Sequence, residues 1–241
     1  MQIFLNYNYI KILIDLNNFD ANDLYFITNI EKKFTLKYEI KMQGMPAEMA
    51  VYSEMQGVNY FKGEQCRTEI ENMMFSIKTY VNNQEAIFCQ DMMDQKMYYK
   101  RTRKEIEAER AKVTDEPKIQ STQETKTILG YPCKKYTITQ QTKDKSEITS
   151  EVWVTESLKL PEAYYLFNSR GNMPSNKLTG TVLLMETPVK MQGTEVKSIM
   201  RVTEVITTPL DAKLFKANTE GYTETTFQEM KNQMRGMGGM R

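Results

Sequence analysis

The chain has 241 residues, of which 40% are hydrophobic and 26% charged, so it is long enough to bury a conventional core without disulfides or metal. The 32 lysines and arginines are interleaved with 31 aspartates and glutamates, which argues against a nucleic-acid partner. The sequence contains no histidine, which removes histidine-based triads and the usual zinc and iron ligand sets. We therefore expect a single domain that is not an enzyme and uses no cofactor.

The first segment, residues 1–32, is rich in Ile, Leu, Phe, Tyr and Asn but lacks the features of a signal peptide. Asp15 and Asp20 interrupt it, and no small-residue cleavage site follows. Its longest apolar run, residues 10–16, is much shorter than the about 20 residues that a membrane-spanning helix needs. We interpret residues 1–32 as an atypical leader, which need not belong to the fold, and we expect no transmembrane segment.

Alternation of apolar and polar residues predicts β-strands along most of the remaining chain. From residue 33 to 42 every second residue is apolar, which is typical of a half-buried strand. Residues 48–55 resume the alternation after the Gly-Met-Pro segment at 44–46, and the two segments are predicted to pair as a hairpin. A further alternating series, residues 73–81, ends at a pair of asparagines that favours a tight turn.

Two positions favour short helices between strands. Thr102 and Glu105 fit a capping box, and the residues that follow are good helix formers, so we expect a short, charged helix that crosses one face of the sheet. Near the end of the chain, residues 209–215 are predicted to form one helical turn that places Leu214 and Phe215 in the core.

Residues 127–155 are the clearest part of the pattern, because Gly130 and Pro132 punctuate runs rich in Thr, Ile, Tyr and Val. This arrangement predicts an antiparallel meander. Two long strands follow at 179–186 and 195–207. The polar connector that contains Pro117 is interpreted as a loop within one sheet and not as an interdomain linker.

Together these elements predict a mainly β protein with one strongly curved antiparallel sheet. We expect a half-barrel of roughly nine to eleven strands in near-continuous meander order, with one or two short helices on the concave side. Residues 33–223 are predicted to form this domain, and residues 224–241 a flexible tail rich in Met and Gly.

Several short motifs follow one another along this domain: Gly130-Tyr131-Pro132-Cys133-Lys134-Lys135-Tyr136, Val152-Trp153-Val154-Thr155, Val202-Thr203-Glu204-Val205, Leu210-Asp211-Ala212-Lys213-Leu214-Phe215 and Gly221-Tyr222. Their order, together with the opening strand, resembles the exported bacterial proteins of domain-of-unknown-function family 4412. The likeness covers residues 33 to about 223 and rests on the order of the motifs, since each motif is short.

That family is similar to the lipoprotein carriers and receptors of the bacterial envelope, whose half-barrel holds helices in its concave side. The resemblance implies a lipid, a lipoprotein acyl chain or another apolar ligand between sheet and helices, and a location in the periplasm or at the outer membrane. It supplies no catalytic residue.

Strand parity indicates which residues would line such a cavity. They are Leu36, Tyr38, Ile40, Met49, Val51, Phe75, Ile77, Val152 and Val154. Trp153 has the opposite parity, so it either faces the other side of the sheet or marks a bulge. The alternative is a structural or interaction protein in which these residues fill an ordinary core.

The sulfur-containing residues leave further alternatives open. Thioethers are soft ligands, so the methionines at the end of the chain are candidates for a Cu(I) site, against a second interpretation as gap-filling residues and a disordered tail. These methionines are Met230, Met234, Met237 and Met240. Cys66, Cys89 and Cys133 are spaced too widely for a CxxC motif, and they fit either one disulfide with a spare thiol or three buried thiols.

Overall fold

The structure is a computed structural model that describes residues 2–7, 10–15, 33–92, 95–111, 117–142, 145–168, 178, 180–191 and 194–237. The chain divides into two compact units, Met1–Lys32 and Lys33–Arg241. The described part of the first unit is an antiparallel hairpin of β1 (Gln2–Tyr7) and β2 (Ile10–Asp15). The interpretation of residues 1–32 as a leader stays a prediction.

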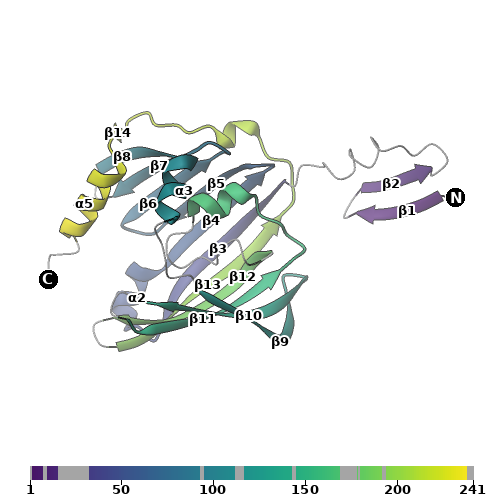
Figure 1. Cartoon of the computed structure of the whole chain (residues 1–241), viewed down its shortest axis with the longest axis horizontal. Helices are drawn as coiled ribbons and strands as arrows, with labels where there is room; N and C mark the ends of the chain where they lie inside the picture. The colour runs from purple at the N-terminus through teal and green to yellow at the C-terminus, as the bar shows by residue number, and fades with distance from the viewer. Residues whose placement is uncertain are drawn as a thin grey trace. The chain divides into compact units, whose positions relative to one another are not determined.

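The second unit contains one large sheet and several short helices (Figure 1). The strands are β3 (Lys33–Gln43), β4 (Met55–Lys62), β5 (Gln65–Glu71), β6 (Phe75–Val81), β7 (Glu85–Met92), β8 (Gln95–Thr102), β9 (Lys118–Ile128), β10 (Tyr131–Gln141), β11 (Glu147–Thr155), β12 (Thr181–Met191), β13 (Thr194–Ile206) and β14 (Thr223–Glu224). The helices are α2 (Ala47–Ser53), α3 (Arg103–Arg110), α4 (Glu162–Asn168), the 3-10 turn η1 (Ala212–Phe215) and α5 (Phe227–Met237).

The twelve strands form a single open sheet in the order β14-β8-β7-β6-β5-β4-β3-β13-β12-β11-β10-β9. All neighbours are antiparallel except β14, which pairs with β8 in parallel. The predicted class, mainly β with one antiparallel sheet, is confirmed. The predicted number of strands was too low, and β14, which has only two residues, is too short to show any alternation.

The predicted meander order holds within two runs of strands and is broken between them, so the sheet consists of two meanders. Strands β3 to β8 run outward from the middle of the sheet, and the chain then passes through α3 to the far edge. Strands β9 to β13 return from there, and β13 pairs with β3. A turn read from sequence shows that the chain reverses but not which strand it rejoins, so the crossover could not be inferred from alternation.

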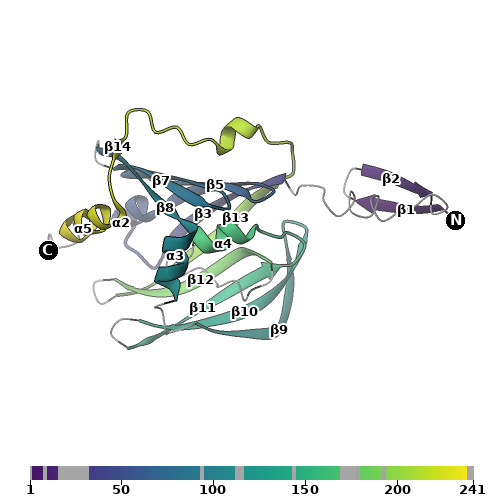
Figure 2. The same cartoon turned by 45° about the horizontal axis from the view of Figure 1, so that its top comes forward.

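Helices α3 and α4 lie between the two halves of the sheet (Figure 2). Helix α4 contacts β5 and β6, and α3 contacts β8 and α4. The predicted capping box starts α3: Thr102 Oγ1 accepts from the backbone N–H of Glu105, and the Glu105 carboxylate accepts from the backbone N–H of Thr102 at 2.7 Å. This prediction is confirmed.

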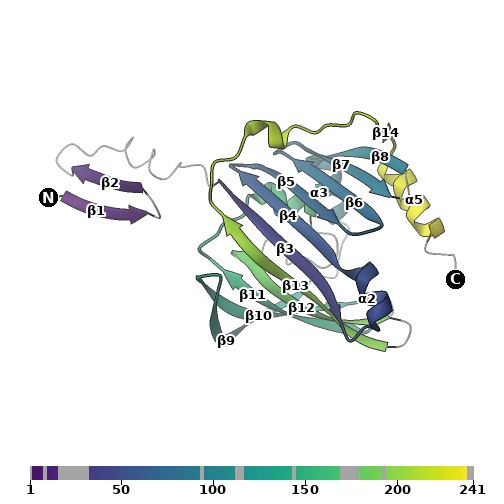
Figure 3. The same ribbon diagram turned by 180° about the vertical axis from the view of Figure 1, so that it is seen from behind.

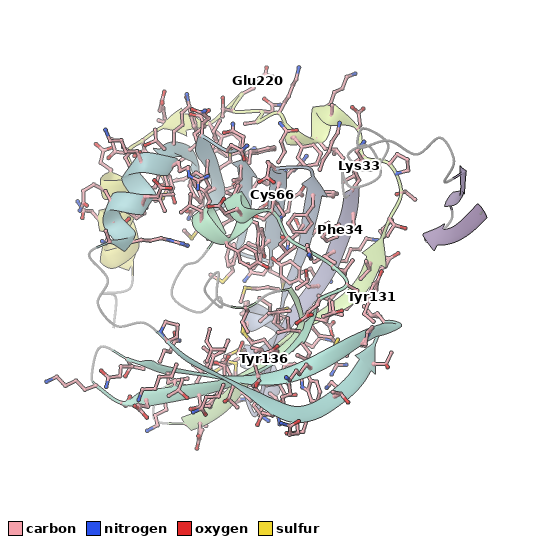
Figure 4. All side chains as sticks on the ribbon, turned by 45° about the vertical axis from the view of Figure 1, so that its right-hand side comes forward. Lys33, Phe34, Cys66, Tyr131, Tyr136 and Glu220 are labelled. Atoms are coloured by element: carbon pink, nitrogen blue, oxygen red, sulfur yellow. The ribbon has the colours of Figure 1, made fainter. Side chains whose placement is uncertain are left out.

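The side of the sheet that faces these helices carries the main core, and we call it the helix-facing side. Phe61 of β4 packs edge-on against Tyr164 of α4, with 5.2 Å between ring centroids. A second, smaller cluster contains Ile138, Val152 and Val154 on β10 and β11. Figure 4 shows the two halves, with Phe34 and Cys66 on one and Tyr131 and Tyr136 on the other.

The chain after β13 wraps around the outer edge of β8 (Figure 3). The Leu214 carbonyl of η1 accepts a hydrogen bond from Arg67 Nη1 at 3.2 Å. Arg67 follows core residue Cys66 on β5 and therefore points to the other side of the sheet. Leu214 and Phe215 are half-buried there, so the prediction that they enter the core is wrong. Beyond β14, Phe227 of α5 reaches the ring of Tyr99 at 5.6 Å.

All three cysteines are free and buried, with exposed fractions of 0% for Cys66, 2% for Cys89 and 3% for Cys133. On β6, the register partner of Cys66 is Val81 and the register partner of Cys89 is Lys78. Because Val81 and Lys78 are three residues apart on one strand, they face opposite sides of the sheet, and so do the two thiols. Burial also raises the pKa of each thiol, which lowers its thiolate fraction.

We therefore expect all three thiols to be unreactive in the folded protein. With Ellman's reagent near neutral pH, the native chain should release far less than one equivalent of thionitrobenzoate within minutes, and the full complement after unfolding in guanidinium. Rapid release of one equivalent from the native chain would show that at least one thiol is accessible.

Candidate functional site

A row of apolar side chains crosses the sheet on its helix-facing side. Each member is the register partner of the next, except where the β5–β6 turn separates Phe75 from Met55. From β7 to β10 the row contains Met92, Phe75, Met55, Ile40, Met200, Met185, Val152 and Tyr136. We call it the apolar row.

The apolar row lies beyond the part of the sheet that α3 and α4 cover. Under α4, Phe34, Leu36 and Phe61 are 1% to 3% exposed and belong to one packed cluster. In contrast, six of the eight members of the apolar row are only half-buried, the exceptions being Met200 and Val152. The neighbouring register partners Ile70 and Ile77 are also half-buried. A continuous apolar strip thus keeps accessible surface.

Tyr38 marks the boundary between the packed cluster and the apolar row. It lies between Leu36 and Ile40 on the same side of β3, and its ring covers its register partner Gly57. A methyl group at Gly57 would lie only 2.1 Å from Tyr38 Cζ, so glycine is needed to make room for the ring. Burial raises the pKa of Tyr38 to about 12, and its hydroxyl is therefore neutral at physiological pH.

The packed cluster also contains an uncharged polar pair. Asn59 is 6% exposed, and its Nδ2 donates to the hydroxyl of Tyr164 at 3.4 Å. The Asn59 Oδ1 has no hydrogen-bond partner among the described residues. Burial raises the pKa of Tyr164 well above its ordinary value, so this pair stays neutral.

The charged residues that alternate with the apolar row face the other side of the sheet. There Lys37 pairs with Glu204 at 2.7 Å, and Lys135 pairs with both Glu124 and Glu151 at 3.1 Å. Within the described ranges, no three Cys, Asp or Glu side chains gather closely enough to hold a metal ion. The apolar row therefore offers an apolar surface, and a charged group beside it is Lys134, whose Nζ lies 5.8 Å from the centre of the Tyr136 ring at the β10 end.

The structure separates the predicted cavity-lining residues into groups. Ile40, Phe75 and Val152 belong to the apolar row, and Ile77 lies next to it. Leu36 and Tyr38 pack in or against the cluster under α4, and Val154 belongs to the second cluster. Trp153 has both features that its parity allowed: it faces the other side, and the pairing of β11 with β12 shifts register next to it.

The prediction that Met49 and Val51 lie on a strand is wrong, because both belong to α2. The Pro46 carbonyl accepts from the backbone N–H of Met49 at 3.0 Å, which closes the first helical turn. Met49 is 41% exposed, and the side chain of Val51 lies outside the described residues. Proline followed by Ala-Glu is a helix-start signal, and it could have identified this helix.

Of the four methionines proposed for Cu(I), the structure describes the side chain of Met230. Met230 is 2% exposed and packs in the main core, so its thioether is not accessible from solvent. Met234 and Met237 lie on α5, but their side chains are outside the described residues, as is the whole of Met240. The copper site stays a prediction.

Sequence analysis missed five members of the apolar row, namely Met55, Met92, Tyr136, Met185 and Met200. Each lies on a segment that was expected to be a strand or to flank one. Their parity could have been read from sequence, but their alignment depends on the register between strands distant in the chain.

The fold and this face define an open antiparallel sheet with one half covered by helices and an accessible apolar strip beside them. The sequence matches the family described as "Domain of unknown function (DUF4412)" over residues 25–220, and the chain belongs to this family. No curated protein matches the sequence. None of the described helices has the length and apolar character needed to span a bilayer.

Among solved structures, the chain is similar to PNGF-II in space group C2, with 17% sequence identity and a TM-score of 0.47. The match covers 84% of this chain and 32% of PNGF-II, so the chain spans about a third of that protein's length.

Proposed function

We propose that this protein is a noncatalytic binding protein of the bacterial envelope, which holds a lipid-like or other apolar ligand on the helix-facing side of its sheet, beside the helices. The observation that carries the proposal is the apolar row, six of whose eight members remain half-buried although they lie on the helix-facing side of the sheet. Its location in the envelope rests only on the resemblance of the family to the lipoprotein carriers.

The dimensions of the apolar row suit an elongated ligand. The row runs from β7 to β10, which are eight strand spacings apart in the sheet. At about 4.8 Å for each spacing, this is a path of about 38 Å along the sheet. An extended acyl chain fits within that length, and every apolar group that it covers contributes favourable burial.

The surroundings of the row favour a neutral chain over a charged ligand. Ion pairs such as Lys37–Glu204 lie on the opposite side, so they provide no counter-ion for a charged group on this side. The polar groups beside the row include the neutral amide of Gln90, which is 5% exposed, and at the β10 end Lys134, whose Nζ lies 5.8 Å from the centre of the Tyr136 ring. An apolar molecule matches this chemistry along most of the row, and Lys134 can face a polar group of the ligand at the β10 end.

The proposal predicts that an environment-sensitive apolar dye, N-phenyl-1-naphthylamine, binds the purified chain and is displaced by fatty acids. Ile40→Asn should weaken dye binding by about 10-fold or more, because it removes apolar contact from the middle of the row. Lys41→Asn is the matched control: it changes the next residue of β3 on the opposite side of the sheet, and binding should stay the same.

The alternative is a filled interior with a structural or interaction role. In that case the dye would bind weakly, both variants would behave alike, and organic extraction of the purified chain would yield no acyl species in stoichiometric amounts. Thermal unfolding of both variants should accompany the titrations, so that a folding defect of Ile40→Asn is not mistaken for lost binding.

A further inference from the structure

One end of the sheet exposes a cluster of large apolar side chains. The described residues include five large hydrophobic side chains that are exposed, and four of them lie at the end where α2 and the β5–β6 turn meet. They are Met49 (41%), Tyr52 (59%), Met73 (75%) and Met74 (47%), which we call the Met rim. The fifth, Leu129, lies on the turn between β9 and β10.

Asn72 fixes the two parts of the Met rim next to each other. Its Oδ1 accepts from the backbone N–H groups of Met74 and Phe75 at 2.8 and 3.0 Å, which holds Met73 and Met74 outward on a tight turn. Its Nδ2 donates to the carbonyl of Tyr52 on α2 at 3.1 Å. The exposed side chains therefore form one patch that spans two elements.

A shallow depression of about 440 Å³ opens beside this patch. Met73, Met74 and Phe75 line it, together with Glu71, Asn72, Ser76 and Asp91. Since Phe75 is also a member of the apolar row, the depression adjoins the end of that row. A side chain inserted here would contact thioether and aromatic groups and have carboxylates nearby.

The Met rim has an acidic border. Residues 44–56 and 71–76 contain Glu48, Glu54 and Glu71 but neither lysine nor arginine. These three carboxylates are exposed. Asp91 borders the depression and pairs with Lys96 at 3.6 Å, so one further acidic group is largely neutralised. Lys41 lies close enough to Glu54 for their charges to interact, so the net negative charge of the border rests mainly on Glu48 and Glu71.

We propose that the Met rim docks a basic amphipathic helix of a partner protein. Unbranched thioether side chains adapt to differently shaped apolar residues, and an apolar helix face is the element that such surfaces receive. The acidic border selects a helix that carries lysine or arginine beside its apolar face. It also disfavours docking on an anionic membrane, whose surface potential has the same sign.

This docking does not depend on an apolar ligand in the proposed binding face, so it can be tested on the full chain alone. The probe is a designed peptide of about 18 residues with leucines on one helical face and lysines on the other, labelled for fluorescence anisotropy. We expect saturable binding that weakens as salt is raised from low to physiological concentration, because the carboxylates contribute to it.

The triple variant Met49→Gln, Met73→Gln, Met74→Gln should lower the affinity for the peptide at least about 10-fold, which is about 1.4 kcal/mol. The control Leu129→Gln replaces the exposed apolar side chain outside the Met rim, and it should leave the affinity unchanged. A second variant, Glu48→Gln with Glu71→Gln, should reduce the salt dependence. All variants change exposed residues, and their melting curves should match the parent.

Three results would overturn the proposal. They are no binding of the lysine peptide, equal affinity of the methionine variant and the parent, and equal or tighter binding of a peptide in which glutamates replace the lysines. Binding of the chain to anionic vesicles, with loss of that binding in the triple methionine variant, would assign the rim to membranes instead and would also overturn it.

Discussion

Replacement of Gly180 by alanine should lower the free energy of unfolding by about 3–5 kcal/mol, a loss that can prevent folding altogether. Gly180 has a φ of +130°, a backbone conformation that L side chains rarely adopt. A methyl group there would lie 2.3 Å from the carbonyl oxygen of Thr155, which is main chain and cannot rotate away. Urea unfolding followed by far-UV circular dichroism measures the change.

The position of Gly180 explains why relief is difficult. Thr155 ends β11 and is the register partner of Thr181, which starts β12, and both threonines are at most 2% exposed. The Gly180 carbonyl also accepts from the Tyr165 hydroxyl at 2.7 Å, which ties α4 to this point. A shift of Gly180 would therefore disturb the strand pairing and the helix together.

Gly130→Ala and Gly221→Ala are the matched controls for this prediction. Both glycines have positive φ values, +82° and +78°, but no atom lies within 4 Å of an added methyl group. Each should cost only the conformational penalty of about 1 kcal/mol. If Gly180→Ala were no more destabilising than these two, close backbone packing at Thr155 would not be a determinant of stability.

Sequence alternation predicted the strands well where one face of the strand is buried and the other is accessible to solvent. On β3 the alternation predicted one inward face, and Phe34 and Leu36 do lie in the packed core. Alternation works there because successive side chains of a strand point to opposite faces, so the period of two links burial directly to sequence.

The sequence could not give the order of the strands beyond each hairpin. β3 is the register partner of β13, more than 150 residues later, and this pairing aligns Ile40 with Met200. Nothing local to either strand specifies that partner, since both would alternate in the same way beside any neighbour. The apolar row depends on this long-range register, so only its separate members were predictable.

Helix α2 shows a different limit. Its seven residues place Met49 and Val51 two apart, as a strand would, and so short a segment does not distinguish the two periods, which leaves the proline before it as the local signal for a helix. Tertiary context decides: α2 packs beside β3, and Asn72 of the β5–β6 turn donates to the carbonyl of Tyr52. The Met rim is formed by that contact between α2 and the β5–β6 turn, and no motif in the sequence predicts the contact.

Tyr164→Ala should lower the free energy of unfolding by about 3–5 kcal/mol, because it removes the aromatic ring that fastens α4 to the sheet. The ring is 6% exposed and makes edge-on contacts with Phe61 at 5.2 Å and with Tyr165 at 5.9 Å. Helix α4 has only seven residues, too few to be stable by itself, so its position depends on such packing. Urea unfolding of the purified variant gives the magnitude.

Tyr164→Phe separates the ring from its hydroxyl. It keeps the contacts with Phe61 and Tyr165 but leaves the Asn59 amide without the hydrogen bond that it donates to the hydroxyl at 3.4 Å. The expected cost is about 1 kcal/mol, since that bond is long and involves neutral groups. A loss as large as that of Tyr164→Ala would instead mean that the buried polar pair, and not ring packing, holds α4 over the sheet. In that case Asn59→Leu, which removes the polar group altogether, should recover stability in the Tyr164→Phe background.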